Sequence, residues 1–452
     1  MKPAGVLHIS RAVAGGQAKA EAVIAETLDR IAEVDGRLNA FTEVLDERAL
    51  DDARRLDARI AAGAQPGALA GVPFAVKNLF DIEGLQTLAG SLIRRDAAPA
   101  TRDAALIARL KAADAILVGA LNMDEFAYGF VTENHHYGPT HNPHDLSRVA
   151  GGSSGGSAAA VSAGLVPLTL GSDTNGSVRV PAALCGVFGL KPTFGALSRD
   201  GMFPFVDSLD HAGLFARSVD DIAAAFDALH GSDTPIAPQL PTLAKRPLRA
   251  GVLGAWFTNG AFPEVLEGLA QVGEALGAVA GVEARGAEAA RSAAFCLTGY
   301  EGGRLHAAEL KARPQDFDPA VRDRLMAGAL LPDDVAALAR RCRTAFREVF
   351  ARLLDDYDIL LAPTVPCPAP LIGQPTMVLD GRPVPVRPNL GAYTQPLSFI
   401  GVPVLSAPVD RPGLPVGVQI IAGPGREDLI LAVASRLEAR GVLACRPPPA
   451  IQ

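Results

Sequence analysis

The pattern of apolar positions changes along the chain, and the change predicts an α/β fold. Near the N-terminus, apolar residues recur at helical spacing over 23–31 and 45–60, with charged residues between them. Asp35-Gly36 is expected to end the first of these helices. After Pro66, short apolar runs alternate with helical stretches, which is typical of a sheet with helices on its faces. The runs lie at 72–76, 115–118 and 166–170, and one intervening helix is expected at 104–113.

A proline-rich segment, residues 233–247, predicts a surface linker in the middle of the chain. Further strands are expected after it, at 248–253, 359–361, 404–407 and 416–421, with helices up to residue 291 and at 332–354. Strands on both sides of a linker can share one sheet. We therefore expect one α/β domain with a large twisted mixed β-sheet flanked by helices and a helical N-terminal region.

Four stretches of this expected domain differ in composition and expected secondary structure. The N-terminal helices take residues 1–62, a glycine-rich core takes 63–240, a variable helical region on the substrate side takes 241–355, and strands with a helix that complete the sheet take 356–452.

Composition narrows the function classes. Among 452 residues, 42 Lys and Arg stand against 49 Asp and Glu, a net charge of −7, which disfavours a broad nucleic-acid-binding face. Five cysteines, none at CxxC spacing, indicate a reducing compartment. No stretch approaches the roughly 20 apolar residues of a membrane span, and the N-terminus lacks a signal-peptide core. We expect a cytoplasmic protein with no membrane and no nucleic-acid partner.

Glycine and serine gather in two segments, GGSSGGS at 151–157 and GSDTNGSVR at 171–179. The first leads directly into a helix-forming run, so its turn would present unpaired backbone N–H groups, which suit an anion. The known phosphate-loop patterns are absent. Residues 151–155 do match G-x-S-x-G, the nucleophile elbow of α/β-hydrolases. That alternative needs a downstream histidine, and the candidates are His211, His230 and His306.

Four histidines, at 135, 136, 141 and 144, form a second candidate cluster. Zinc is the obvious ligand for such a group. Their spacing matches no common zinc pattern, and Gly138, Pro139 and Pro143 make the segment a loop. A solvated loop is the main expectation and a metal site is the alternative.

Taken together, several segments resemble the amidase signature family, from about residue 20 to residue 440. These segments lie at 71–78, 122–129, 151–157, 171–195 and 413–419. The resemblance implies the family's fold and its catalytic unit of a serine, a cis serine and a lysine. Carried over by position, the nucleophile is Ser177, the bridging serine is Ser153 rather than Ser154, and the lysine is Lys77.

The resemblance also implies an oxyanion hole made by backbone N–H groups around the nucleophile. These belong to Thr174, Asn175, Gly176 and Ser177. Asp173 and Arg179 would orient this turn. Asn175 stands where the family usually has glycine. A left-handed backbone is still reachable at this position, because asparagine tolerates it better than most residues.

Elementary chemistry supports these roles. A serine hydroxyl needs a base within hydrogen-bond reach, and a lysine serves only when it is neutral. Its pKa must then fall from ~10.4 to roughly 7–8 through burial and nearby dipoles. Lys77 follows an apolar run and can meet these conditions, with Ser153 as the relay to Ser177. No metal or organic cofactor is required.

The substrate is less constrained. Segments 301–306 and 313–317 resemble the branch of the family that hydrolyses 1-carboxybiuret. The rival branch, the amidase subunit of the glutamyl-/aspartyl-tRNA amidotransferase, carries a carboxylate for the α-amino group of glutamine. Residues 390–393 offer none. We expect a small ureido acid whose carboxylate is held by Arg324, with Tyr300 as a further contact. Either residue can instead be an ordinary surface or core side chain.

The predicted reaction is therefore amide hydrolysis with release of ammonia, and most specifically the conversion of 1-carboxybiuret to 1,3-dicarboxyurea. The resemblance implies homo-oligomerisation and a small helical partner subunit. A tRNA amidotransferase component and another ureide or amide hydrolase remain alternatives. An inactive scaffolding homologue also remains, although all three positions of the catalytic unit are filled.

Overall fold

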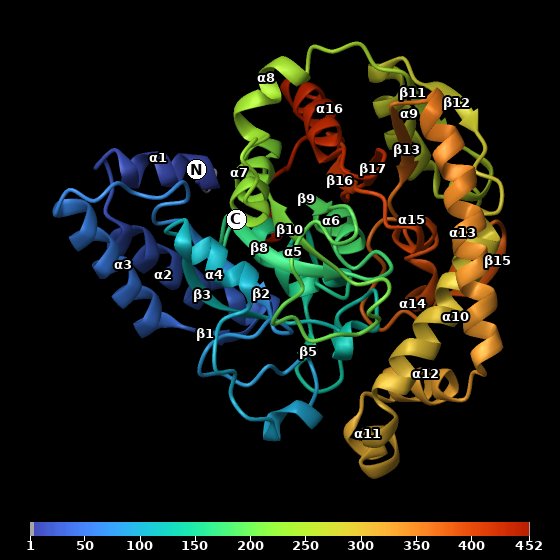
Figure 1. Ribbon diagram of the computed structural model, residues 1–452, viewed down its shortest axis with the longest axis horizontal. Coiled ribbons are helices and arrows are strands. Elements are labelled where there is room, and N and C mark those ends of the chain that lie inside the picture. The colour runs from blue at the N-terminus through green and yellow to red at the C-terminus, as the bar shows by residue number, and fades with distance from the viewer. Residues whose placement is uncertain (1–3, 452) are drawn as a thin grey trace.

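A single mixed sheet runs through the computed structural model, which describes residues 4–451. Its eleven strands lie in the order β1-β3-β2-β8-β10-β9-β16-β17-β13-β11-β12 (Figure 1). They are β1 (Phe41–Val44), β2 (Pro73–Lys77), β3 (Ile116–Leu121), β8 (Leu168–Asp173), β9 (Phe188–Lys191), β10 (His211–Ala216), β11 (Ala250–Leu253), β12 (Val279–Val282), β13 (Ile359–Pro363), β16 (Val404–Pro408) and β17 (Gly417–Ile421).

The sheet combines both kinds of pairing. Strand β2 pairs in parallel with β3 and β8, the strands from β8 to β13 pair antiparallel, and β11 is parallel to both β12 and β13. All residues of β2, β3, β8, β10 and β16 are buried, as expected for strands covered on both faces. The predicted fold class, a large mixed sheet flanked by helices, is confirmed.

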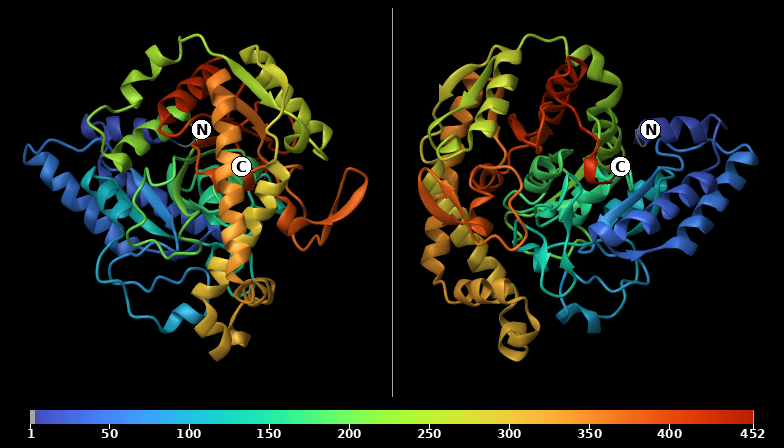
Figure 2. Two further views of the ribbon diagram at one scale, coloured as in Figure 1. Left: turned by 45° about the vertical axis from the view of Figure 1, so that its right-hand side comes forward. Right: turned by 180° about the vertical axis from the view of Figure 1, so that it is seen from behind.

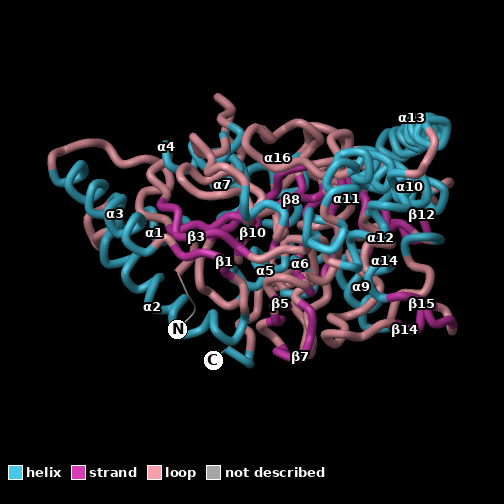
Figure 3. The backbone as a smooth tube through the Cα atoms, turned by 90° about the horizontal axis from the view of Figure 1, so that it is seen from below, coloured by secondary structure: helices cyan, strands magenta, loops and turns pink. Residues whose placement is uncertain are grey.

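Helices cover both faces of the sheet, above and below the strands in Figure 3. They are α1 (Val6–Ala14), α2 (Ala20–Leu38), α3 (Asp46–Ala61), α4 (Ala105–Ala112), α5 (Gly155–Ser162), α6 (Arg179–Cys185), α7 (Val219–His230), α8 (Leu240–Leu243), α9 (Pro263–Leu276), α10 (Ala287–Leu305), α11 (Ala307–Ala312), α12 (Pro319–Ala329), α13 (Asp333–Asp356), α14 (Val386–Asn389), α15 (Gln395–Ile400) and α16 (Glu427–Ala439). Short hairpins add β4 (Glu133–Asn134), β5 (Gly138–Pro139), β6 (His141–Asn142), β7 (Asp145–Val149), β14 (Thr376–Leu379) and β15 (Arg382–Pro385).

The two ends of the sheet carry different helices. Helices α1, α2 and α3 gather at the β1 end, whereas α10, α12 and α13 lie at the other side of the molecule (Figure 1). The long helix α13 runs along this second side of the molecule. The β14–β15 hairpin projects outward on the same side (Figure 2). Helix α10 packs against α12, α13 and α15, so it joins this helical layer to the middle of the fold. In the described residues, no helix is both long enough and apolar enough to cross a membrane.

Most apolar runs became strands where expected, but the N-terminal region differs from the prediction. Helix α2 does not stop at Asp35-Gly36. It continues to Leu38 and ends at Asn39, whose φ is 54°. The Asp35 carboxylate accepts the N–H groups of Ala40 (2.9 Å) and Phe41 (3.1 Å), so it fixes the chain after the helix rather than ending it. Strand β1 follows at once, and the expected helical region therefore also supplies an edge strand.

Candidate active site

Lys77 lies at the edge of the sheet where two neighbouring parallel strands, β2 and β8, end. It is the last residue of β2, and the register pairs Val76 with Leu170 of β8. The carboxyl ends of both strands therefore meet at one edge, as parallel pairing requires. Lys77 Nζ lies 2.6 Å from Ser153 Oγ and 2.9 Å from Ser172 Oγ, and the lysine is 0% exposed.

The segment from Gly151 to Ser154 contacts the loop that carries Ser177. The peptide bond between Gly152 and Ser153 is cis. The N–H of Ser154 donates to the carbonyl oxygen of Ser177 (3.3 Å), so the two loops are in contact. Ser154 Oγ instead donates to the carbonyl of Ser172 in β8 (3.2 Å). It is therefore Ser153, not Ser154, whose hydroxyl meets the lysine.

Asp173 shapes the turn that carries Ser177. Its Oδ1 accepts the N–H of Gly176 (2.8 Å) and its Oδ2 accepts that of Val178 (3.2 Å). Arg179 donates to both oxygens of this carboxylate at 3.0 Å, and both side chains are 0% exposed. Burial favours a raised pKa for Asp173, but the Arg179 guanidinium outweighs it and holds the pKa well below its usual range. Both side chains thus contact this turn or each other, and their orienting role stays a prediction.

Arg179 also ties the turn to the C-terminal half of the chain. It donates to Gln419 Oε1 (2.7 Å), to the carbonyl of Thr394 (3.2 Å) and to Ser398 Oγ. Because Gln419 lies on β17 and Ser398 on α15, distant segments fix the conformation of the nucleophile loop.

Two details of the expected oxyanion hole change. The Gly176 N–H is already engaged by Asp173, so Thr174, Asn175 and Ser177 remain the candidate donors. Asn175 does not use the left-handed conformation that asparagine tolerates, because the positive-φ residues of the described chain do not include it. The residue with positive φ is Gly176, at 135°, where an added Cβ would collide with Thr394 Oγ1. Glycine is therefore needed at position 176 of this turn.

The electrostatics prepare Lys77 to act as a base. Burial lowers the pKa of Lys77 from 10.5 to about 7, while the nearby Asp124, Asp210 and Asp173 oppose this shift. A neutral amine can donate one N–H to Ser172 and still offer its lone pair to the hydroxyl of Ser153. Neutral Lys77 is therefore populated near pH 7, within the range that the sequence argument required.

Three residues of this site were missed by sequence reasoning. Ser172 contacts Lys77 directly. Asp124 lies under the glycine loop and accepts the N–H of Thr132 (3.0 Å), and Asp210 accepts the hydroxyl of Thr174 (2.7 Å). Burial raises the pKa of each of these carboxyls to about 6. Asp124 lies in one of the segments that carry the resemblance, whereas nothing in the sequence around Asp210 indicated a role.

Arg324 and Tyr300 have different surroundings. The Arg324 guanidinium carbon lies 3.5 Å from the centre of the Tyr128 ring and 5.9 Å from that of Phe295, and the side chain donates to the Tyr128 carbonyl (3.1 Å). The Tyr300 hydroxyl donates to Asp333 on α13 (2.9 Å), at the exposed surface. A substrate contact remains a prediction for both residues. Arg324 contacts Tyr128, which lies in the same segment as Asp124, 122–129.

The histidine cluster is divided among separate partners. His136 Nε2 lies 3.0 Å from Glu125 Oε1, His141 Nδ1 lies 2.6 Å from the Leu146 carbonyl, and His144 Nε2 lies 3.1 Å from the Cys185 carbonyl. No group of three or more His, Cys, Asp or Glu residues in the described chain is placed to hold a metal ion. His211, a candidate for the elbow alternative, directs Nδ1 at the carbonyl oxygens of Leu209 (2.6 Å) and Asp173 (3.0 Å).

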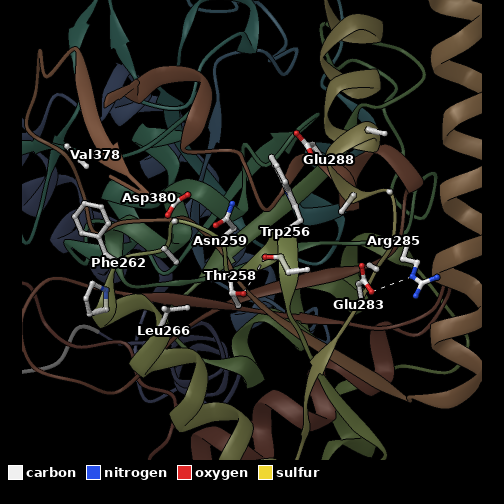
Figure 4. Close-up of a pocket in the computed structure, with 18 residues that line it drawn as sticks. Trp256, Thr258, Asn259, Phe262, Leu266, Glu283, Arg285, Glu288, Val378 and Asp380 are labelled. Carbon is white, nitrogen blue, oxygen red and sulfur yellow. Dashed lines mark hydrogen bonds and ion pairs between the residues drawn. The ribbon is translucent and has the colours of Figure 1, made fainter. Parts of the chain in front are cut away.

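An open pocket of about 1220 Å³ lies beside β11, β12 and the start of α10 (Figure 4). Three carboxylates line it, those of Glu283, Glu288 and Asp380, with Arg285 as the one basic residue among its lining residues. Arg285 is itself paired with Glu283 at 3.4 Å, as the dashed line in Figure 4 marks. This pocket therefore does not suit an anionic substrate, and none of the predicted catalytic residues lines it.

Comparison with known proteins gives a consistent result. The profile of the amidase family matches residues 22–431. AtzE, a 1-carboxybiuret hydrolase subunit of Pseudomonas sp. strain ADP, is 50% identical over 449 residues, which cover 96% of this chain and 98% of the relative. A glutamyl-tRNA(Gln) amidotransferase subunit of Picosynechococcus sp. is 38% identical, over 91% of this chain and 93% of the relative. A solved structure, described as a vestigial protein complex that reveals the evolutionary origins of an s-triazine catabolic enzyme, superposes with a TM-score of 0.96. The two sequences are 48% identical, and the matched region covers 98% of this chain and 100% of the chain in that structure.

Proposed function

The chain belongs to the amidase family, and from that premise we propose that it hydrolyses the terminal amide of 1-carboxybiuret. The products are ammonia and 1,3-dicarboxyurea. The observation that carries the chemistry is the fully buried Lys77, with its pKa lowered to about 7 and its amine 2.6 Å from Ser153. A buried lysine whose amine is largely neutral near pH 7 can act as a base for the adjacent serine.

The proposed reaction has two halves. Ser177 Oγ attacks the terminal carbamoyl carbon while its proton passes to Ser153 and the proton of Ser153 passes to neutral Lys77. The oxyanion is held by backbone N–H groups of the 174–177 turn, where one such donor is worth roughly 2.7–4 kcal/mol of the barrier. Lys77 returns its proton through Ser153 to the leaving nitrogen, and the C–N bond breaks to release ammonia. Water, activated by the same relay, then cleaves the acyl-enzyme ester and frees Ser177.

The choice of substrate rests on two supports. One is the identity of 50% to a 1-carboxybiuret hydrolase subunit, against 38% to an amidotransferase subunit, both over nearly the whole chain. The other is Arg324, whose guanidinium is stacked on Tyr128 and can bind a carboxylate with two parallel hydrogen bonds. A ureido acid carries such a carboxylate. Tyr300 is a second proposed contact, and it would first have to leave Asp333.

We infer that the enzyme forms homo-oligomers and works in the cytoplasm with a small helical partner subunit. The five cysteines are all free thiols, which suits a reducing compartment. Co-expression with any small neighbouring open reading frame, followed by size-exclusion chromatography with light scattering, tests the assembly. A lone monomer under these conditions would contradict it.

The experiment that tests the function is ammonia release by the purified chain. The panel is 1-carboxybiuret, biuret, glutamine and a simple aromatic amide, with the Ser177→Ala variant as the background. Release from 1-carboxybiuret, lost in the variant, is expected. Release from glutamine alone would show an amidotransferase component instead, and release only from other amides would remove the proposed substrate.

A further inference from the structure

Asn175 is held firmly in the turn that carries the nucleophile. Its Nδ2 donates to Thr298 Oγ1 on α10 (2.8 Å), and its main-chain carbonyl accepts the hydroxyl of Thr394 (2.7 Å). The residue is 7% exposed. Both ends of Asn175 are therefore fixed by segments more than 100 residues away, and its side chain has a defined position two residues before Ser177.

One atom of this ordered side chain has no partner. Asn175 Oδ1 is buried and accepts no hydrogen bond from the described residues. More than nine-tenths of buried polar groups in proteins are satisfied, and leaving one unpaired costs roughly 1–3 kcal/mol. The backbone of Asn175 gives no reason for this residue either, because its φ is not positive. The unpaired carbonyl oxygen is suited to a hydrogen-bond donor that arrives with the ligand.

The position of Asn175 fits a contact with substrate. Thr298, its partner, lies one helical turn from Phe295 on α10, so the two side chains share a face of that helix. The Phe295 ring lies 5.9 Å from the Arg324 guanidinium carbon. Asn175 and the arginine proposed to bind the substrate carboxylate therefore contact two neighbouring residues of α10, Thr298 and Phe295.

We propose that Asn175 Oδ1 accepts an N–H of the substrate next to the carbonyl that Ser177 attacks. It would thereby make the enzyme selective for ureas and carbamates over amides and esters that lack this N–H. The proposal deepens the proposed function and rests on it for the class of substrate. Each urea-type carbonyl of 1-carboxybiuret has nitrogen on both sides, so one N–H remains for recognition while the other nitrogen leaves. Sites with a buried hydrogen-bonding group discriminate strongly against analogues that lack its partner.

The test compares two esters of nearly equal shape, 4-nitrophenyl carbamate and 4-nitrophenyl acetate, which differ by NH₂ against CH₃ beside the carbonyl. In both, Ser177 attacks the carbonyl carbon and 4-nitrophenolate leaves. The burst of nitrophenolate gives the rate of acylation even where the carbamoyl-enzyme is slow to hydrolyse. For Asn175→Leu, both rates are expected to fall, and the carbamate/acetate ratio is expected to drop at least tenfold. An unchanged ratio would overturn the proposal.

Further variants separate recognition from folding. Asn175→Gly removes the same acceptor without adding an apolar side chain, and it should give the same drop in ratio if Asn175→Leu does not fold. Thr298→Val removes the anchor of Nδ2 and should lower the ratio, whereas Thr298→Ser keeps the hydroxyl and should preserve it. Equal ratios in these two variants would count against an anchored Asn175. Neither ester depends on 1-carboxybiuret, so a failure of the proposed substrate and a failure of this inference give different results.

Discussion

Replacing Lys77 by methionine should remove the cost of burying an ionisable amine, which weakens the fold at neutral pH. In the unfolded chain the lysine has its ordinary pKa near 10.5, whereas burial lowers the pKa to about 7 in the folded state. Between these two values the unfolded state binds more protons than the folded state, so the wild-type free energy of unfolding rises with pH. The destabilisation of the folded state by Lys77 is fully present below pH 7 and disappears as pH rises toward 10.5.

The size of this effect follows from the same two values. Linkage between a folded pKa of about 7 and an unfolded pKa of 10.5 gives a contribution of Lys77 that changes by about 2 kcal/mol between pH 7 and pH 9. Methionine cannot titrate. The stability gained by Lys77→Met over the wild type should therefore be greatest at pH 7 and smaller by about 2 kcal/mol at pH 9. This range lies above the pKa of about 6 that burial gives Asp124.

Urea unfolding of both proteins at several pH values measures this difference. Lys191 supplies a matched control, because it is also 0% exposed and burial lowers its pKa to about 7. Its amine donates to the carbonyls of Pro192 (3.0 Å) and Val402 (2.6 Å) rather than to a serine. Lys191→Met should show the same pH trend and retain hydrolysis, whereas Lys77→Met should lose hydrolysis. A stability difference for Lys77→Met that is independent of pH would refute a neutral lysine in the folded enzyme.

Three other substitutions test the surroundings of this base. Arg179→Met should lower the free energy of unfolding in urea by roughly 3–5 kcal/mol, because it leaves the Asp173 carboxylate buried without its ion pair; a loss below about 1 kcal/mol would contradict this. Ser172→Ala should move the acidic limb of the kcat/KM profile to lower pH, because Ser172 Oγ accepts a hydrogen bond from Lys77 and favours its charged form. An unmoved or raised limb would count against that contact. Arg324→Ala should raise KM for 1-carboxybiuret about tenfold or more and leave KM for uncharged biuret nearly unchanged, whereas equal changes would make Arg324 structural.

The sequence predicted the features of this protein that depend on short, continuous stretches of residues. Apolar runs gave the positions of β2, β3, β8 and β16, and the glycine-rich motifs located the segments around Lys77, Ser153 and Ser177. The contact of Lys77 with Ser172 depends on the pairing of β2 with β8, which no local pattern encodes. The sequence therefore indicated the neighbourhood of the lysine but not all of its partners.

The corrections have the same origin. Asp173 takes the Gly176 N–H, and Thr394, 218 positions after Gly176, decides which residue of the turn must be glycine. Asp210 reaches the turn from the start of β10, a strand that the apolar pattern did not reveal. Such contacts join segments that are far apart in the chain, so only the folded structure shows them.

Covalent labelling of the nucleophile tests the central claim most directly. The reagent is a fluorophosphonate, whose phosphorus is attacked by activated nucleophilic serines. It is incubated with the wild type and with Ser177→Ala, Ser153→Ala and Lys77→Ala. The adduct is then mapped by peptide mass spectrometry. We predict one adduct, on Ser177, whose rate of formation rises with pH through about 7, the pKa of Lys77. The adduct should be absent in Ser177→Ala and form far more slowly in the other two variants. An adduct on another residue, or an unchanged rate in Lys77→Ala, would contradict the proposed serine–serine–lysine relay.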